Sequence, residues 1–419
     1  MPPNPRHVLS SFMAIIGAIM VLVAVFAKQT GLSHSVASWP ALLMLLFGTT
    51  LITVGLLRRR SLKVYTTLAI LSANTAVLFL SIEFGALVLN RIMGTHVLYH
   101  GNPDTSVDEF LQISSKQSIY VGWRGQPFQG NKININQDGL RLTPPVVDSQ
   151  AVPIRVFTFG GSTMWGEGAA DDETIASFLQ ALLTEQCGHV VQVTNFGQRG
   201  WVSTQGLIEL LLQLEHGNVP DAVVFYDGYN EVTAAYSTGE IGIPENFQGM
   251  TTYGNAAKIA LRNIARQSEM GRMFSSVTQR PVTRIDVGPV SQAVVDTYLS
   301  VLRITRSLGK EYGFDVLFYW QPQLYTDRKI LTTEEAALLD HPWLPEPVKA
   351  LTTAVYELAR RAADADSQLT DISDCFAGQT ERIYLDPCHI VGAGNRLVAE
   401  AMLRHHLLEV IQNRLSLKR

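Results

Sequence analysis

The stretch 154–169, IRVFTFGGSTMWGEGA, changes at its centre from a strand-like apolar run to a glycine-rich turn. A short apolar run typical of a β-strand, residues 156–159, ends in Gly160 and Gly161, and a helical pattern begins further along the chain. Two glycines allow the backbone to turn sharply. The stretch therefore predicts a strand, a tight turn and a helix. Ser162 would lie at the carboxyl end of the strand, where open α/β sheets place their ligand sites.

A serine at such a turn can have one of three roles. It can be a nucleophile, a helix N-cap or a phosphate-loop residue. A serine hydroxyl is a poor nucleophile by itself, because it needs a neighbouring base and a carboxylate that orients the base. The rest of the chain decides whether Ser162 has these partners.

Beyond Ser162 the chain alternates between helical and strand-like segments. The helical patterns cover 173–186, 203–214, 291–312, 347–363 and 395–413, and the strand patterns cover 190–195, 222–226 and 315–320. Strands between amphipathic helices predict a mostly parallel sheet with helices on both faces. Residues 92–153 are rich in turn signals and predict a linker with short strands packed on the domain that follows. Residues 237–289 are poorly patterned, as is typical of a functional lid or a disordered insertion.

The first 91 residues differ from the rest of the chain in their long apolar stretches. Apolar stretches cover about 8–27, 41–57 and 64–89 in a chain that is 47% hydrophobic and 17% charged. About 20 residues that rise ~1.5 Å each cross the ~30 Å hydrocarbon layer of a bilayer. A signal peptide is the alternative for the first stretch, but no clear small-x-small cleavage site comes after it. We expect an N-terminal bundle of three transmembrane helices.

Charge predicts the orientation of this bundle and excludes one class of partner. The loop 58–63, RRRSLK, is the most basic in the region, so the positive-inside rule places it and the N-terminus in the cytoplasm. Everything after residue 91 would then lie outside, in the periplasm or the extracellular space, on a protein integral to an inner or plasma membrane. This larger part is net acidic, which argues against nucleic acid as a partner.

Candidate partners for Ser162 stand at three later points. Gly197 follows one predicted strand, Asn230 follows the next, and Asp386 and His389 precede the last helix. The carboxyl ends of parallel strands share one edge of a sheet, so these residues should gather there. His389 offers a base and Asp386 a carboxylate to orient it. The backbone N–H of Gly197 and the amide of Asn230 offer donors for a carbonyl oxygen that becomes negative.

These residues carry a resemblance to a known family. The blocks in chain order are GGST at Ser162, NFG at Gly197, GYNE at Asn230, and DPCH at Asp386 and His389. Together they resemble the four blocks of the SGNH hydrolases, also called GDSL hydrolases. The resemblance covers roughly residues 154–408 and none of the apolar N-terminal region. The first block reads GGST instead of GDSL, so Gly161 replaces the aspartate of the family, while the serine is kept.

The resemblance implies a fold and roles for these residues. The fold would be a flavodoxin-like three-layer α/β/α sandwich with a mostly parallel sheet, over a catalytic domain at 154–419. Ser162 would be the nucleophile, His389 the base and Asp386 its orienter. The backbone N–H groups of Ser162 and Gly197 and the amide of Asn230 would form the oxyanion hole.

The three cysteines leave one question open. Cys187, Cys375 and Cys388 form no CxxC pair and no ligand cluster with histidine, which argues against structural zinc, and we expect no metal and no organic cofactor. Cys375 and Cys388 bracket the loop that delivers Asp386 and His389. The domain is expected to lie outside the cytoplasm, where disulfides persist. A bridge between them would close a loop of about 14 residues and stabilise the fold by ~3 kcal/mol.

The sequence thus predicts a membrane-anchored serine esterase. It would hydrolyse acyl esters, O-acetyl esters among them, of cell-surface glycans or lipids outside the cytoplasm. An O-acyltransferase that modifies an exported polysaccharide is the alternative, and three helices are too few to deliver its acyl donor without a partner membrane protein. A non-catalytic envelope scaffold protein is a further alternative, against which the set of Ser162, Asp386 and His389 argues.

Overall fold

The computed structural model describes residues 14–15, 17–22, 39–56, scattered positions in 67–85, and then 107–145, 152–244, 285–339, 345–365 and 369–418. The chain divides into two compact units. One consists of Met1–Val97 with Thr252–Pro281, and the other of Leu98–Thr251 with Val282–Arg419.

The first unit contains the helix α2 (Trp39–Leu56), whose 18 residues carry no charged side chain. Gly17 lies against it, since a Cβ on Gly17 would stand 2.5 Å from the carbonyl oxygen of Gly48. Most of the predicted spans 8–27 and 64–89 lies outside the described residues. Among the residues that are described, no helix is both long enough and apolar enough to cross a membrane, so the predicted three-helix bundle finds no support there.

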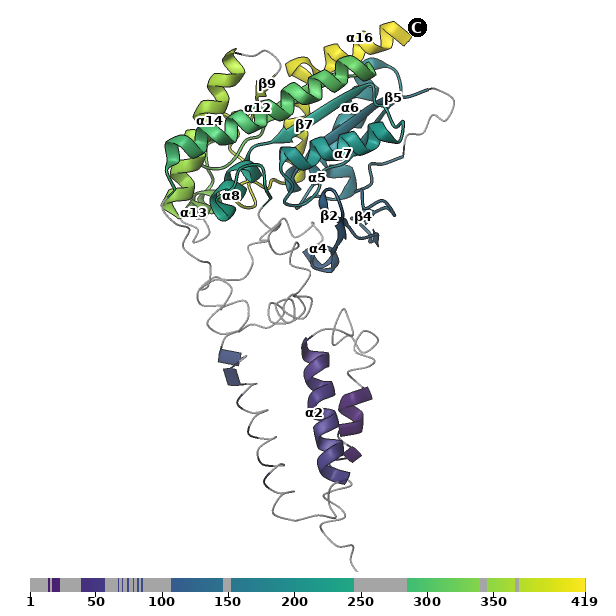
Figure 1. Cartoon of the computed structure of the whole chain (residues 1–419), viewed down its shortest axis with the longest axis vertical. Coiled ribbons are helices and arrows are strands. Elements are labelled where there is room, and N and C mark those ends of the chain that lie inside the picture. Colours follow the sequence, from purple (N-terminus) through teal and green to yellow (C-terminus); the bar gives the residue numbers. More distant parts are fainter. Residues whose placement is uncertain are drawn as a thin grey trace, which may run out of the picture. The chain divides into compact units, whose positions relative to one another are not determined.

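The second unit is built on a five-stranded sheet in the order β6-β5-β7-β8-β9. Figure 1 labels β5, β7 and β9 of this sheet, with helices such as α6, α7 and α12 beside it. The strands are β5 (Ile154–Gly160), β6 (Val191–Asn195), β7 (Ala222–Asp227), β8 (Asp315–Trp320) and β9 (Leu369–Asp371). Every neighbouring pair is parallel. In chain order this is 2-1-3-4-5, the doubly wound order of flavodoxin-like folds, whose ligand site lies where the strand order reverses. The predicted parallel sheet is confirmed, and the reversal falls between β5 and β7.

Helices cover both faces of the sheet because its strands are apolar on both sides. On one face, side chains such as Val156 and Val224 pack against α6 (Ile175–Cys187), α15 (Gly392–Met402) and α16 (Leu408–Lys418). On the other face, side chains such as Phe159 and Phe225 pack against α7 (Ser203–Glu215), α8 (Tyr229–Thr238), α12 (Val287–Tyr312) and α14 (Glu346–Ala365). The result is three layers.

Stacked phenylalanines tie the central strands together on the second face. The ring centroids of Phe159 and Phe225 are 4.8 Å apart, and those of Phe225 and Phe318 are 4.4 Å apart. Such pairs stabilise a fold by about 0.5–1.5 kcal/mol beyond the area that they bury. The row runs across β5, β7 and β8, with one ring from each strand, so it holds β5, which ends just before Ser162, in register with its neighbours.

Smaller elements flank this core. Two antiparallel hairpins precede it, β1 (Ser115–Ser118) with β2 (Gly122–Gly125) and β3 (Phe128–Gln129) with β4 (Asn134–Ile135). Short helices are α4 (Val107–Gln112), α5 (Ser162–Trp165) and α13 (Thr333–Leu338). The predicted insertion 237–289 begins at the end of α8 and reaches into the start of α12, and its residues 245–284 lie outside the described residues.

Candidate active site

The turn after β5 places Ser162 at the first position of α5. A Cβ on Gly160 would lie 2.4 Å from the carbonyl oxygen of Tyr226 on β7, and a Cβ on Gly161 would lie 2.2 Å from the amide nitrogen of Asn230. Neither position has room for a side chain without a shift of its neighbours. The two glycines therefore allow β5 to end close against β7, and the predicted strand, turn and helix are confirmed.

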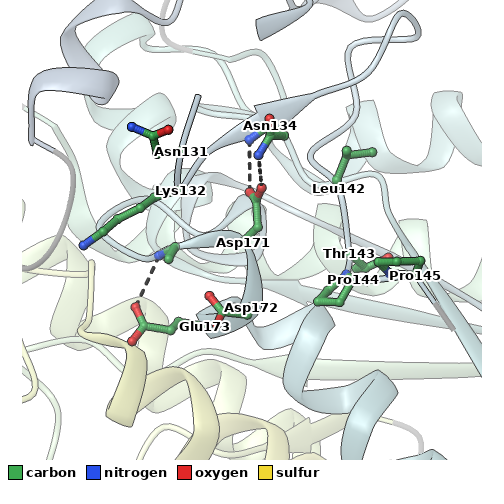
Figure 2. A pocket seen from close by; sticks show the side chains of 11 residues that line it. Asn131, Lys132, Asn134, Leu142, Thr143, Pro144, Pro145, Asp171, Asp172 and Glu173 are labelled. Atoms are coloured by element: carbon green, nitrogen blue, oxygen red, sulfur yellow. Dashed lines mark hydrogen bonds between the residues drawn. The ribbon is translucent and has the colours of Figure 1, made fainter. Parts of the chain in front are cut away.

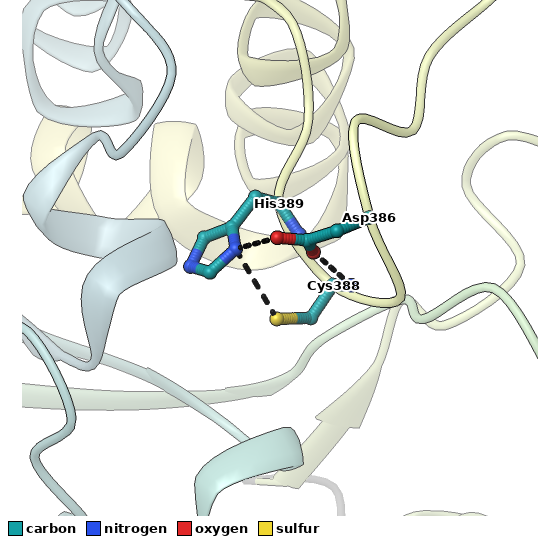
Figure 3. Close-up of side chains that lie close together, drawn as sticks. All are labelled: Asp386, Cys388 and His389. Atoms are coloured by element: carbon teal, nitrogen blue, oxygen red, sulfur yellow. Dashed lines mark hydrogen bonds and ion pairs between the residues drawn. The ribbon is translucent and has the colours of Figure 1, made fainter. Parts of the chain in front are cut away.

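Three side chains form a hydrogen-bonded chain at this turn. His389 Nε2 lies 2.6 Å from Ser162 Oγ, and His389 Nδ1 lies 2.5 Å from Asp386 Oδ2. The other carboxylate oxygen, Asp386 Oδ1, accepts the backbone N–H groups of Cys388 at 2.9 Å and of His389 at 2.8 Å. Figure 3 shows the imidazole turned edge-on toward this carboxylate. The structure thus brings together all three predicted triad residues, although Ser162 and His389 are 227 positions apart in the sequence.

Charges shift the pKa values of this group in opposite directions. Burial alone would raise the pKa of Asp386, but the charge and hydrogen bonds of His389 outweigh burial and lower that pKa to about 2. Burial alone would lower the pKa of His389, but the negative charges around it, Asp386 first, raise that pKa well above 6.5. Asp386 is therefore ionised, and His389 is a stronger base than a free imidazole.

Asn230 lies where an oxyanion donor is needed, beside the Ser162 turn. Its Nδ2 donates one hydrogen bond to the carbonyl oxygen of Trp201 at 2.7 Å. An amide nitrogen carries two N–H bonds, so the carbonyl orients the group and leaves its second N–H for another acceptor. The backbone N–H of Ser162, at the first position of α5, has no acceptor within its own helix.

Gly197 does not fill its predicted role. Its N–H already donates to Asn195 Oδ1 at 2.9 Å, and a Cβ on it would meet the backbone nitrogen of Trp165 at 2.7 Å. This glycine allows close packing and offers no spare donor. Gly200, at φ +74°, is the better candidate, because its N–H makes no hydrogen bond within the described part of the chain. The next residue, Trp201, holds the amide of Asn230.

One buried carboxylate at the site escaped the sequence reasoning. Glu167 Oε2 lies 3.8 Å from His389 Nε2, and the Glu167 side chain is only 5% exposed. Arg199 binds both of its carboxylate oxygens. The nearest signal in the sequence is the charge of Glu167 inside an otherwise apolar, glycine-rich turn.

The predicted disulfide is not formed. Cys375 and Cys388 are both free thiols, as is Cys187. Cys388 instead packs beside the triad, with its Sγ 3.8 Å from His389 Nδ1. Burial raises the pKa of the Cys388 thiol to about 11, so it stays protonated and acts as a small apolar side chain.

The group of Asp386, Cys388 and His389 is also a set of metal-ligand types, since their ligand atoms lie within 4.8 Å of one another (Figure 3). Their hydrogen bonds fit a triad better than a metal site. Both oxygens of Asp386 are engaged by His389 and by backbone N–H groups. A metal would also require the thiolate, which the raised pKa of Cys388 disfavours.

A cavity of about 620 Å³ opens between the second hairpin and the segment before α6 (Figure 2). Its lining mixes polar residues such as Asn134, Asp171 and Glu173 with apolar ones such as Leu142 and Pro144, and it contains no member of the triad. Asp171 is held there by Asn134 and by the buried guanidinium of Arg141 at 2.9 Å. These bonds tie the hairpin to the chain beyond the nucleophile turn.

Comparisons with known proteins give weak similarities. No protein-family model matches the sequence, and no curated protein does. Among solved structures, an α/β hydrolase from the metagenome of Lake Arreo is 14% identical, with 61% of this chain and 95% of that chain covered at a TM-score of 0.34. A variant of an acetyl-xylooligosaccharide esterase from Geobacillus stearothermophilus is 13% identical, with 62% and 96% covered at 0.36.

A member of the lipolytic G-D-S-L family from Veillonella parvula is 15% identical, with 60% of this chain and 96% of that chain covered at a TM-score of 0.35. At such identities and TM-scores the likeness assigns no activity to this chain.

Proposed function

We propose that this chain is a serine esterase of the SGNH type. One observation carries the proposal, namely the unbroken hydrogen-bonded chain from Ser162 Oγ through His389 to Asp386, with links of 2.6 and 2.5 Å. Serine, histidine and aspartate in this order activate a hydroxyl for attack on an acyl carbon. The flavodoxin-like strand order adds support, since Ser162 lies where the order reverses.

The carboxylate sets which ring nitrogen carries the proton. Ionised Asp386 accepts a hydrogen bond from the N–H at Nδ1 of His389, so the lone pair on Nε2 faces Ser162 Oγ. His389 takes the serine proton as Oγ attacks the ester carbonyl, and then gives it to the leaving alcohol. Water attacks the acyl-serine in the second half of the reaction, and His389 again takes the proton.

The tetrahedral intermediates need hydrogen-bond donors for their oxyanion. The backbone N–H of Ser162, the backbone N–H of Gly200 and the second amide N–H of Asn230 supply them in this proposal. Trp201 supports the arrangement, because its carbonyl oxygen holds the amide and it directly follows Gly200.

The proposed location of the enzyme at a membrane is inferred from the sequence. Three apolar stretches in residues 1–91 and the basic loop 58–63 support a membrane anchor with the esterase outside the cytoplasm. Esters on cell-surface glycans or lipids are the substrates within its reach there. The same site would transfer the acyl group if a sugar hydroxyl replaced water, and a partner membrane protein would then deliver the donor.

Hydrolysis of p-nitrophenyl acetate by the full chain tests the proposal. Ser162→Ala should release nitrophenolate at least about 10³-fold more slowly than wild type, because the nucleophile is gone. Circular dichroism checks that the variant is folded. Equal rates for the folded variant and wild type would refute the proposal. Free acetate as product indicates an esterase, and an acetylated glycan formed when glycan is added indicates a transferase.

A further inference from the structure

Glu167 is placed by the nucleophile turn itself. Its backbone N–H donates to the carbonyl oxygen of Ser162 at 2.9 Å, so the residue is held in a fixed geometry relative to the catalytic serine. Its side chain turns back toward the triad, where Oε2 lies 3.8 Å from His389 Nε2. This is the ring nitrogen that contacts Ser162 Oγ, so Glu167 stands beside the reacting atoms.

Arg199 fixes the carboxylate in this position. Its Nε donates to Oε2 and its Nη2 to Oε1 of Glu167, both at 2.8 Å. Two parallel charge-assisted bonds define the plane of a carboxylate as well as its place. The guanidinium also lies 5.8 Å from the ring centre of Phe110 and 6.0 Å from that of Trp165, which restrains it further.

The distance between Glu167 and His389 indicates what joins them. A separation of 3.8 Å is too long for a direct hydrogen bond. Two polar atoms at this separation can share one water molecule at ordinary hydrogen-bond lengths. Such a water would contact Nε2, the atom that must receive a proton when the acyl-serine is resolved.

Water differs from an alcohol in carrying two protons on its oxygen. When water attacks the acyl-serine, one proton passes to His389 Nε2, while the other stays on the oxygen and can donate a hydrogen bond. Oε2 of Glu167 lies close enough to Nε2 to serve one molecule together with it. A simple alcohol has no second proton for this carboxylate.

We propose that Glu167 is a positioning residue that selects water as the acyl acceptor. This inference rests on the proposed esterase function. Oε2 accepts a hydrogen bond from the attacking water while Nε2 removes its other proton, and the water oxygen bonds to the acyl carbon. The bond from the acyl carbon to Ser162 Oγ then breaks, and His389 returns its proton to Oγ. The free acid leaves, and Glu167 gains no proton in the cycle.

The product ratio in water–methanol mixtures tests this selection. The full chain is given p-nitrophenyl acetate, and acetate and methyl acetate are both quantified. The ratio reports only how the acyl-serine divides between acceptors, whichever step limits the overall rate. Wild type should form mainly acetate. Glu167→Leu should raise the ratio of methyl acetate to acetate about tenfold, because water alone loses a hydrogen bond to a charged group. Glu167→Gln keeps a neutral oxygen acceptor and should raise the ratio by a smaller factor.

Glu209 offers a matched control. It is also a buried carboxylate paired with an arginine, Arg124, and on α7 its side chain bonds to Arg124 and Gln213. Glu209→Gln should leave the product ratio unchanged. An unchanged ratio in both Glu167 variants, with or without a lower total rate, would overturn the inference and leave the esterase proposal standing. If folded wild type forms neither product, the proposed function fails, and the inference falls with it.

Discussion

Replacing Asp386 by asparagine tests how the triad works without changing its shape. Asp386 Oδ1 accepts two backbone N–H groups, from Cys388 and His389, and only an oxygen can accept them. Asparagine must therefore keep its carbonyl oxygen there and turn its NH₂ group toward His389 Nδ1. The NH₂ group donates, so Nδ1 has to accept and the ring proton moves to Nε2. A protonated Nε2 cannot take the proton of Ser162.

The loss should therefore be large in rate and small in stability. A wrong histidine tautomer lowers kcat by about 10⁴ in serine hydrolases of this kind, or ~5 kcal/mol of transition-state stabilisation. The backbone hydrogen bonds of the loop are kept, so the Tm should change by only a few degrees. Steady-state hydrolysis of p-nitrophenyl acetate and thermal unfolding measure the two effects. Asp371→Asn is a control, because Asp371 pairs with Arg360 at the end of β9. More than a tenth of wild-type kcat in Asp386→Asn would refute the tautomer argument.

Three further predictions concern the donors, the base and the support of the catalytic loop. Asn230→Ala should lower kcat by about 10²–10³ with little change in KM, because it removes a donor that acts on the oxyanion; a change confined to KM would contradict this. The pKa of His389 is raised, so kcat/KM should rise with pH through an apparent pKa above 6.5 as the base loses its proton; a plateau reached below pH 6 would contradict it. Glu335→Ala should lower the free energy of unfolding in a urea titration by about 3–5 kcal/mol. The variant leaves the buried ammonium of Lys329 without its ion-pair partner and removes the acceptor of two backbone N–H groups just before the catalytic loop. A loss under 1 kcal/mol would show that Glu335 does not support the loop.

The central sheet could be predicted because its strands repeat a strong local signal. The patterns at 190–195, 222–226 and 315–320 correspond to β6, β7 and β8. Strand β9 has only three residues, too few for any periodicity to show, and it forms by pairing with β8. Short edge strands of this kind depend on a neighbour that one sequence does not reveal.

The site could be predicted in part for a related reason. Ser162, Asp386 and His389 stand at strand ends or in a loop, and the topology brings them together. Gly197 was misjudged because a side chain two residues away, Asn195, uses its N–H, and no spacing rule shows that. Glu167 was missed because its partner Arg199 lies 32 residues away and meets it only in the folded chain.

The disulfide was predicted from the spacing of Cys375 and Cys388 and from the expected location of the domain outside the cytoplasm. Neither the spacing nor the expected location shows whether the two thiols reach each other, and the structure leaves both of them free. Cys388 Sγ lies 3.8 Å from His389 Nδ1, and Cys375 packs against the hydrophobic core on one face of the sheet. Whether two cysteines meet is decided by the directions of their side chains, which depend on the folded loop.

Covalent labelling shows whether Ser162 is an activated nucleophile in the folded chain. A fluorophosphonate reacts with a serine whose hydroxyl is activated by a neighbouring base, and intact-mass measurement counts the adducts. The account predicts one adduct on the folded wild-type chain, located at Ser162 by peptide mapping. It predicts no adduct on Ser162→Ala and strongly slowed labelling of His389→Ala. A folded wild type that does not react, or an adduct that persists in Ser162→Ala, would contradict the account.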